Sequence, residues 1–227
     1  MTIEADTLLI QVRDELRDTR EPFLVSDTQI YRALTAAQNT LARTALCFTS
    51  AGELSYTVAA NKGWVDVAPE IIRPRHIQVR GTDHIVEPTI STEINDLLVS
   101  SDYGRLTTLN WRVETDTVPR FAVTDMAFNR WRLVPIPTTE ITLDVEAWVY
   151  APPIEAGGDS PLAAQTSEGL VHGAITLLLM MPDVDMYDGN KSEYHNMQWL
   201  TYLSLMQSDT KSHTRPSRLT RQRKGYW

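Results

Sequence analysis

The segment ITLDVEAWVY, residues 141–150, decides the fold class of this chain because its side chains alternate in character. From Ile141 to Val149 every second residue is aliphatic, and the residues between them are polar or larger. Successive side chains of a strand point to opposite faces of a sheet. The alternation therefore predicts a strand with one buried face.

Further strand patterns precede this segment. From about Glu53 the apolar period is two, and glycine, proline and β-branched residues become frequent, which indicates a β-domain. A short helix is expected between the strands, over residues 92–98. The other expected strands cover residues 54–58, 64–67, 71–79, 85–90, 121–124 and 130–134.

The chain before the β-domain has the pattern of two amphipathic helices. Apolar residues recur every four positions from Leu8 to Leu16, and Pro22 interrupts this period. Ser26 and Gln29 have the spacing of a capping box, in which each side chain bonds the other's backbone N–H, so a second helix is expected to begin there.

Two more helices are expected after Pro152 and Pro153. One begins near Thr166, ends before Pro182 and is apolar around most of its circumference, so it must be covered by other helices or by neighbouring subunits. The next runs over residues 190–207, and the chain from Ser208 onward lacks periodicity.

The expected fold class is α+β, with N- and C-terminal helices in one bundle and an antiparallel β-domain inserted between them. With 227 residues, 42% of them hydrophobic, the chain is long enough for such a core. The expected domains are a helical bundle of residues 1–50 and 160–208, a β-domain of residues 51–159, and an extended basic tail of residues 209–227.

Charge is distributed unevenly. Residues 211–227 carry six basic side chains and no acid, whereas the first 210 residues carry 15 bases and 29 acids. A net-acidic body disfavours broad binding to DNA, and a short basic extension suits an acidic partner surface or a nucleic acid.

The C-terminal tail is the candidate functional site. Long cations with terminal aromatic residues are typical of interface anchors, so docking on a protein partner is the preferred interpretation. A solvated, disordered terminus and a nucleic-acid-binding arm are the alternatives. The candidate residues are Lys211, Arg215, Arg218, Arg221, Arg223, Lys224, Tyr226 and Trp227.

No pattern in the sequence indicates catalysis. Phosphate-binding glycine loops and the Gly-x-Ser-x-Gly elbow are both missing, and Cys47 has no histidine close in sequence. The five histidines do not have the spacing of metal ligands on one helix, and the acidic turn from Asp183 to Asp188 lacks the glycine and glutamate positions of a calcium loop. We expect no catalytic, cofactor or metal site, and hence no enzyme.

Neither a signal peptide nor a membrane span is recognisable in the sequence. The expectation is a protein made in the cytoplasm that does not contact a membrane.

One region resembles the head-to-tail adaptor family of tailed bacteriophages. The strand ending in Leu133-Val134-Pro135-Ile136-Pro137 is followed by the alternating strand, a Pro-rich loop and an apolar helix that carries Gly173-Ala174. Met180-Met181-Pro182, the acidic turn and a helix containing Tyr194 complete the similarity. It covers roughly residues 130–207 and the helical N-terminus, whereas residues 53–119 have no match.

The resemblance implies a structural ring, commonly of twelve copies, in the neck of the virion beneath the portal. In such a ring the C-terminal segment enters portal grooves and the far side meets a tail or nozzle protein. The ring extends the DNA channel, through which DNA passes without sequence-specific binding. The alternatives are a tail-tube or gatekeeper ring protein, and a nucleic-acid-binding module that uses the basic tail.

Overall fold

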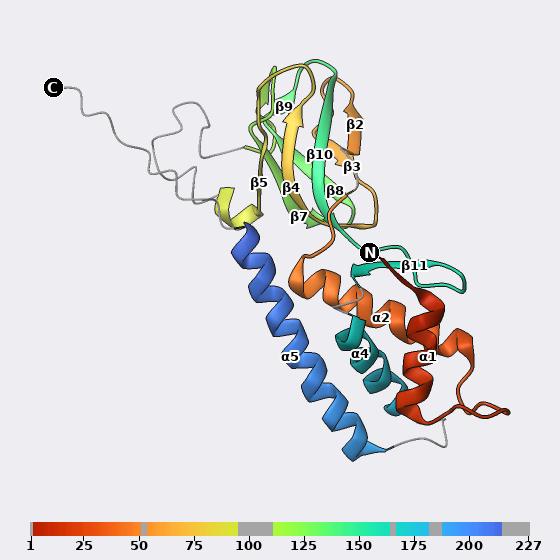
Figure 1. Ribbon diagram of the computed structural model, residues 1–227. Coiled ribbons are helices and arrows are strands. Elements are labelled where there is room, and N and C mark those ends of the chain that lie inside the picture. Colours follow the sequence, from red (N-terminus) through yellow and green to blue (C-terminus); the bar gives the residue numbers. More distant parts are fainter. Residues whose placement is uncertain (1, 51–53, 95–110, 164–166, 182–187, 215–227) are drawn as a thin grey trace. The chain divides into compact units, whose positions relative to one another are not determined.

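The structure is a computed structural model that describes residues 2–50, 54–94, 111–163, 167–181 and 188–214 (Figure 1). It divides into two compact units. The helical unit comprises Met1–Cys47 and Ala151–Trp227, and the β unit comprises Phe48–Tyr150. The chain is therefore mixed α+β, as the sequence predicts.

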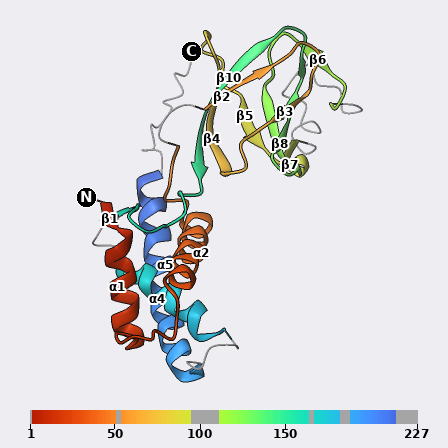
Figure 2. The ribbon, with the colours of Figure 1, turned by 90° about the vertical axis from the view of Figure 1, so that its right-hand side faces the viewer.

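The helical unit contains four helices and one two-stranded sheet among its described residues (Figure 2). The sheet pairs β1 and β11 in antiparallel orientation, and this pairing ties the start of the chain to the segment that leaves the β unit. The elements are β1 (Thr2–Glu4), α1 (Ala5–Leu16), α2 (Asp27–Ala45), β11 (Asp159–Ala163), α4 (Ser167–Leu179) and α5 (Gly189–Thr214).

The expected start of the second helix is confirmed in detail. The Ser26 backbone N–H donates to Gln29 Oε1 at 2.9 Å, and the Gln29 backbone N–H donates to Ser26 Oγ at 3.3 Å. Two N–H groups that have no partner inside α2 are thus satisfied by side chains.

Helix α4 is the centre of the helical unit. It packs against α1, α2 and α5, and ten of its thirteen residues are buried, among them Leu170, Ala174 and Ile175. This confirms that a helix so apolar is covered by other helices. Leu177 is an exception among its apolar residues, since 38% of it is exposed.

Helix α5 is longer than the sequence pattern predicts. Residues 208–214 were expected to be extended, but α5 continues to Thr214. Helical hydrogen bonds can extend a helix past the end of its hydrophobic period, because they do not depend on side-chain character. The remainder of the expected tail lies outside the described residues.

The β unit contains nine strands among its described residues: β2 (Leu54–Val58), β3 (Trp64–Asp66), β4 (Ile71–Val79), β5 (Glu87–Thr89), β6 (Thr115–Asp116), β7 (Phe121–Ala127), β8 (Arg130–Val134), β9 (Ile136–Pro137) and β10 (Ile141–Val149). Their orders are β2-β10-β4, β3-β8-β7-β5 and β6-β9. Pairing is antiparallel except for β5 with β7 and β6 with β9. Of the expected short helix over 92–98, only the first residues are described, and Ser91–Ile94 form a helical turn.

The alternation predicted for residues 141–150 is confirmed in strand β10. Ile141, Leu143, Val145 and Ala147 are buried, and Leu143 lies opposite Tyr56 on β2 and Val79 on β4. The buried series belongs to an apolar core that the three-stranded and four-stranded sheets share. The central strand of one sheet thus carries much of the core of the β unit.

Replacing Leu143 by alanine tests this role. We expect Leu143→Ala to lower the free energy of unfolding by about 2–5 kcal/mol, because it leaves a cavity in a fully buried site. Phe128→Ala is the control, since Phe128 is fully exposed and its loss should cost within about 0.5 kcal/mol. Chemical denaturation followed by tryptophan fluorescence measures both, and equal effects would contradict the assigned core.

Candidate functional site

The candidate docking residues of the tail lie at and beyond the end of α5. The backbone of Lys211 is in the last part of this helix. Arg215, Arg218, Arg221, Arg223, Lys224, Tyr226 and Trp227 lie outside the described residues. What the structure describes is therefore the helix that carries the tail and the packing that holds this helix in place.

Two glycines of α4 allow α5 to approach closely. A Cβ atom placed on Gly169 would lie 2.1 Å from Cγ of Tyr202, and one on Gly173 would lie 3.0 Å from Trp199. The rings of Trp199 and Tyr202 stack with their centroids 5.6 Å apart. Aromatic side chains of α5 thus occupy the space that side chains at these two positions would fill.

The same pair of helices is joined by two histidines. Nδ1 of His172 on α4 lies 2.8 Å from Nδ1 of His195 on α5, and only 2% of His195 is exposed. Tyr194 contacts both rings edge-on, with centroids 6.4 Å from His172 and 5.2 Å from His195. Two nitrogens at this distance share one proton, so the bond requires that at least one ring is neutral.

The surroundings of His195 favour its neutral form. Burial lowers the pKa of His195, the nearby His172 and Lys191 lower it further, and Glu15 of α1 acts in the opposite direction. His172 also lines a cavity of about 570 Å³ together with Asp14, Glu15 and Glu168. The α4–α5 contact therefore contains an ionisable pair whose hydrogen bond depends on pH.

A buried arginine holds the connection between α1 and α2. Arg13 donates to Asp18 Oδ2 at 3.0 Å and to the Val25 carbonyl oxygen at 3.1 Å, and it also pairs with Asp27. Asp18 in turn accepts from the backbone N–H groups of Leu24 and Val25 at 3.0 and 3.1 Å. Both charges of the Arg13–Asp18 pair are thus compensated in a place that excludes most water.

The outward face of α5 is uncharged and exposes several large apolar side chains among polar ones. Tyr194, Met197 and Leu200 recur every three residues and are each more than half exposed, as is Leu205. No Asp, Glu, Lys or Arg occurs from residue 194 to residue 208. Trp199 and Leu203 of the same helix are buried. A helix with apolar residues on both its inner and outer faces offers a surface on which another protein can pack.

The described residues contain no group of three or more histidine, cysteine, aspartate or glutamate side chains that could hold a metal ion. Cys47 is half-buried, and burial raises the pKa of its thiol to about 11. A thiol with so high a pKa is almost entirely protonated at neutral pH and is therefore a poor nucleophile. None of the helices in the described part of the chain is both long and apolar enough to cross a lipid bilayer.

Sequence reasoning missed three of these features. His172 and His195 are 23 residues apart on different helices, so no spacing rule connects them. Arg13 stands among charged residues between the apolar positions of α1, and a buried arginine has no sequence signature of its own. The sequence did contain an indication of the contact made by Gly173, because the Gly173-Ala174 pair was part of the family resemblance.

The β unit lies between the two parts of the helical unit in the sequence, and α5 is followed in the sequence by the basic C-terminal segment. The model of the SU10 adaptor protein family matches residues 3–222, which is nearly the whole chain, and the chain belongs to this family. It is thus a bacteriophage adaptor protein, a structural component of the virion. No curated protein matches the sequence.

Loss of the Arg13 side chain should strongly destabilise the helical unit. We expect Arg13→Ala to lower the free energy of unfolding by about 3–5 kcal/mol, because Asp18 is then buried without its counter-charge. Chemical denaturation followed by circular dichroism at the helical band measures the change. Arg20→Ala removes an exposed arginine just beyond α1 and should change stability by less than about 0.5 kcal/mol. Equal costs would exclude a special role for Arg13.

The histidine pair predicts that the helical unit is less stable in acid. Because the pKa of His195 is lower in the folded protein than in the unfolded chain, the unfolded chain binds more protons as the pH falls. The contribution of His195 is therefore complete above about pH 6.5, the ordinary histidine pKa, and is lost as the pH falls through the lower folded pKa.

Denaturation midpoints of the helical unit between pH 5 and 8 test this dependence. His195→Asn should flatten the decrease in stability below about pH 6.5, whereas His76→Asn in the β unit should leave it unchanged. An identical pH profile in the wild type and in His195→Asn would show that the pair does not control this dependence.

Proposed function

We propose that this adaptor protein forms a ring beneath the portal of the virion, as one layer of the neck that joins capsid to tail. The observation that carries the proposal is the family match over residues 3–222, which runs from the first helices into the basic C-terminal segment. Twelve copies would match the symmetry that the family resemblance implies.

The uncharged outer face of α5 supports assembly with neighbouring subunits. Tyr194, Met197 and Leu200 expose apolar surface that a contact between subunits would remove from water. Large apolar and aromatic side chains are enriched at the centres of protein interfaces, and charged residues are depleted there. In the proposed ring this face packs on an adjacent protein.

The basic C-terminal segment is proposed to dock on the portal. Its residues Lys211, Arg215, Arg218, Arg221, Arg223 and Lys224 supply donors for carboxylates of the partner, and Tyr226 and Trp227 supply aromatic anchors. Cations that pair with carboxylates also accelerate association through long-range attraction. The segment would thus both guide the ring to the portal and hold it there.

The acidic body suits a channel through which DNA slides. The first 210 residues hold 29 acids and 15 bases, so the body as a whole repels phosphates and does not retain them. The proposed role is accordingly mechanical: the ring extends the channel and links the portal to a tail or nozzle protein, without catalysis.

Charge reversal in the C-terminal segment tests the docking. The triple variant Arg218→Glu, Arg221→Glu and Arg223→Glu should weaken binding to purified portal protein by at least about a hundredfold, since each lost charged contact costs about 2–5 kcal/mol when buried. Co-sedimentation and electron microscopy of the mixture measure this. The matched control places the same reversals at Arg20, Lys62 and Arg75, which are exposed elsewhere.

The control should bind the portal as the wild type does. Unchanged portal binding by the triple C-terminal variant would contradict the docking role. Binding to tail proteins but not to the portal would instead favour a tail-tube or gatekeeper ring.

A further inference from the structure

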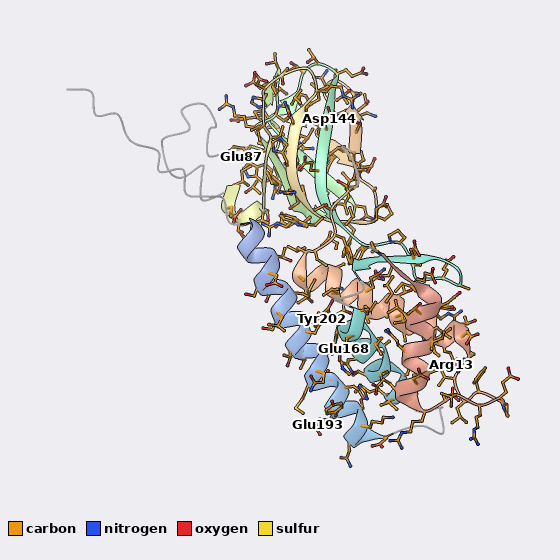
Figure 3. The ribbon with its side chains drawn as sticks, viewed as in Figure 1. Arg13, Glu87, Asp144, Glu168, Glu193 and Tyr202 are labelled. Carbon is orange, nitrogen blue, oxygen red and sulfur yellow. The ribbon has the colours of Figure 1, made fainter. Side chains whose placement is uncertain are left out.

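A groove of about 820 Å³ runs along α2 in the helical unit. One wall consists of successive turns of α2 from Asp27 to Asn39, and the other consists of Asp6 and residues 153–156. The groove is separate from the α4–α5 contact and from the uncharged outer face of α5. Figure 3 draws the described side chains as sticks and labels Arg13, Glu168, Glu193 and Tyr202 in the helical unit.

Hydrogen-bond acceptors dominate the polar part of the lining. Asp6, Asp27 and Glu155 contribute carboxylates, and Arg32 is the only base among the lining residues. The Tyr31 hydroxyl donates to Asp6 Oδ1 at 2.6 Å, and this bond lowers the pKa of Asp6, which is therefore ionised at neutral pH. The groove carries negative charge and favours a cationic occupant.

One acceptor in the lining has no partner of its own. Asn39 lines the groove, and its Oδ1 atom is buried without a hydrogen bond among the described residues. A buried acceptor without a donor is energetically unfavourable. The exposed residues Ala36, Pro153 and Ala156 of the lining offer apolar surface to an occupant.

Residues 215–227 of the same chain have the matching chemistry. They carry five basic side chains and no acid, and they end in Tyr226 and Trp227. Arginine and the indole of tryptophan are donors without acceptor groups, so they complement a groove rich in acceptors. Aromatic side chains also bury large apolar areas at low entropic cost.

The end of α5 is near enough for this segment to reach the groove. Gln207 Nε2 donates to the Thr44 carbonyl oxygen at 3.4 Å, which places the last turns of α5 beside the end of α2. Asn39 is five residues before Thr44, a distance of about 7–8 Å along a helix. A thirteen-residue segment spans up to about 43 Å when extended.

We propose that the groove along α2 binds the chain's own C-terminal segment, residues 215–227, before the protein joins its partner. The segment would then have two alternative sites, the groove in the free protein and the portal in the assembled virion. Occupation of the groove would keep a basic, aromatic segment from binding other acidic surfaces before assembly. The groove site does not depend on portal docking, although its proposed purpose rests on it.

Photo-cross-linking in the full-length protein tests the proposal. Tyr226 is replaced by p-benzoylphenylalanine, the isolated protein is irradiated at low concentration, and the adducts are located by mass spectrometry. We expect the principal adducts within one chain, on residues 27–39 of α2 or on residues 153–156. Adducts elsewhere, adducts only between two chains, or no adducts would overturn the proposal.

A matched pair of variants tests whether the groove itself is required. Ala36→Arg with Glu155→Lys fills and reverses the charge of the groove at two exposed lining positions, and it should reduce the adduct yield at least fivefold. Thr40→Arg with Glu140→Lys makes the same changes at exposed positions that do not line the groove. This control should retain the wild-type yield, and equal yields in both variants would overturn the proposal.

Portal binding of the same variants separates the two proposals. The groove variant should bind the portal at least as tightly as the wild type, because its C-terminal segment no longer has a competing site. Weaker portal binding by the groove variant would contradict the proposal that the C-terminal segment occupies either the groove or the portal. If the wild type cross-links to its groove but does not bind the portal, only the proposed docking fails.

Discussion

The close packing of α4 against α5 is the constraint on which the rest of the helical unit depends. It requires Gly169 and Gly173, because a Cβ atom at either position would collide with or press against Tyr202 or Trp199. Any larger residue at Gly169 would separate the helices, since even a methyl carbon would lie 2.1 Å from the Tyr202 ring. That contact also brings His172 and His195 together and directs the helix that carries the C-terminal segment.

Local features of the fold could be predicted from the sequence, because each has a short-range physical cause. The alternation in β10 and the capping box of Ser26 and Gln29 both follow from residues within ten positions of one another. The pairing of β1 with β11 could not be predicted, since it joins residues about 160 positions apart and neither strand has a distinctive pattern. The extension of α5 beyond Gln207 was missed because the hydrophobic period ends before the helix does.

The candidate site was predicted less completely than the fold. Composition alone identified the basic C-terminal segment, because charge asymmetry is visible without any structure. The groove along α2 was not visible, since its lining combines residues of α2 with Asp6 and residues 153–156 from distant parts of the chain. The groove forms only when the fold brings these residues together. Only then can a groove rich in acceptors be recognised as complementary to a segment rich in donors.

The central claim is that this SU10-family adaptor forms a ring beneath the portal and docks through its C-terminal segment. Cryo-electron microscopy of virions that contain the protein tests this most directly. The account predicts a ring of density under the portal, with residues 211–227 inserted into grooves of the portal protein. Density for the chain at another place in the particle, or a ring whose C-terminal segments do not touch the portal, would contradict it.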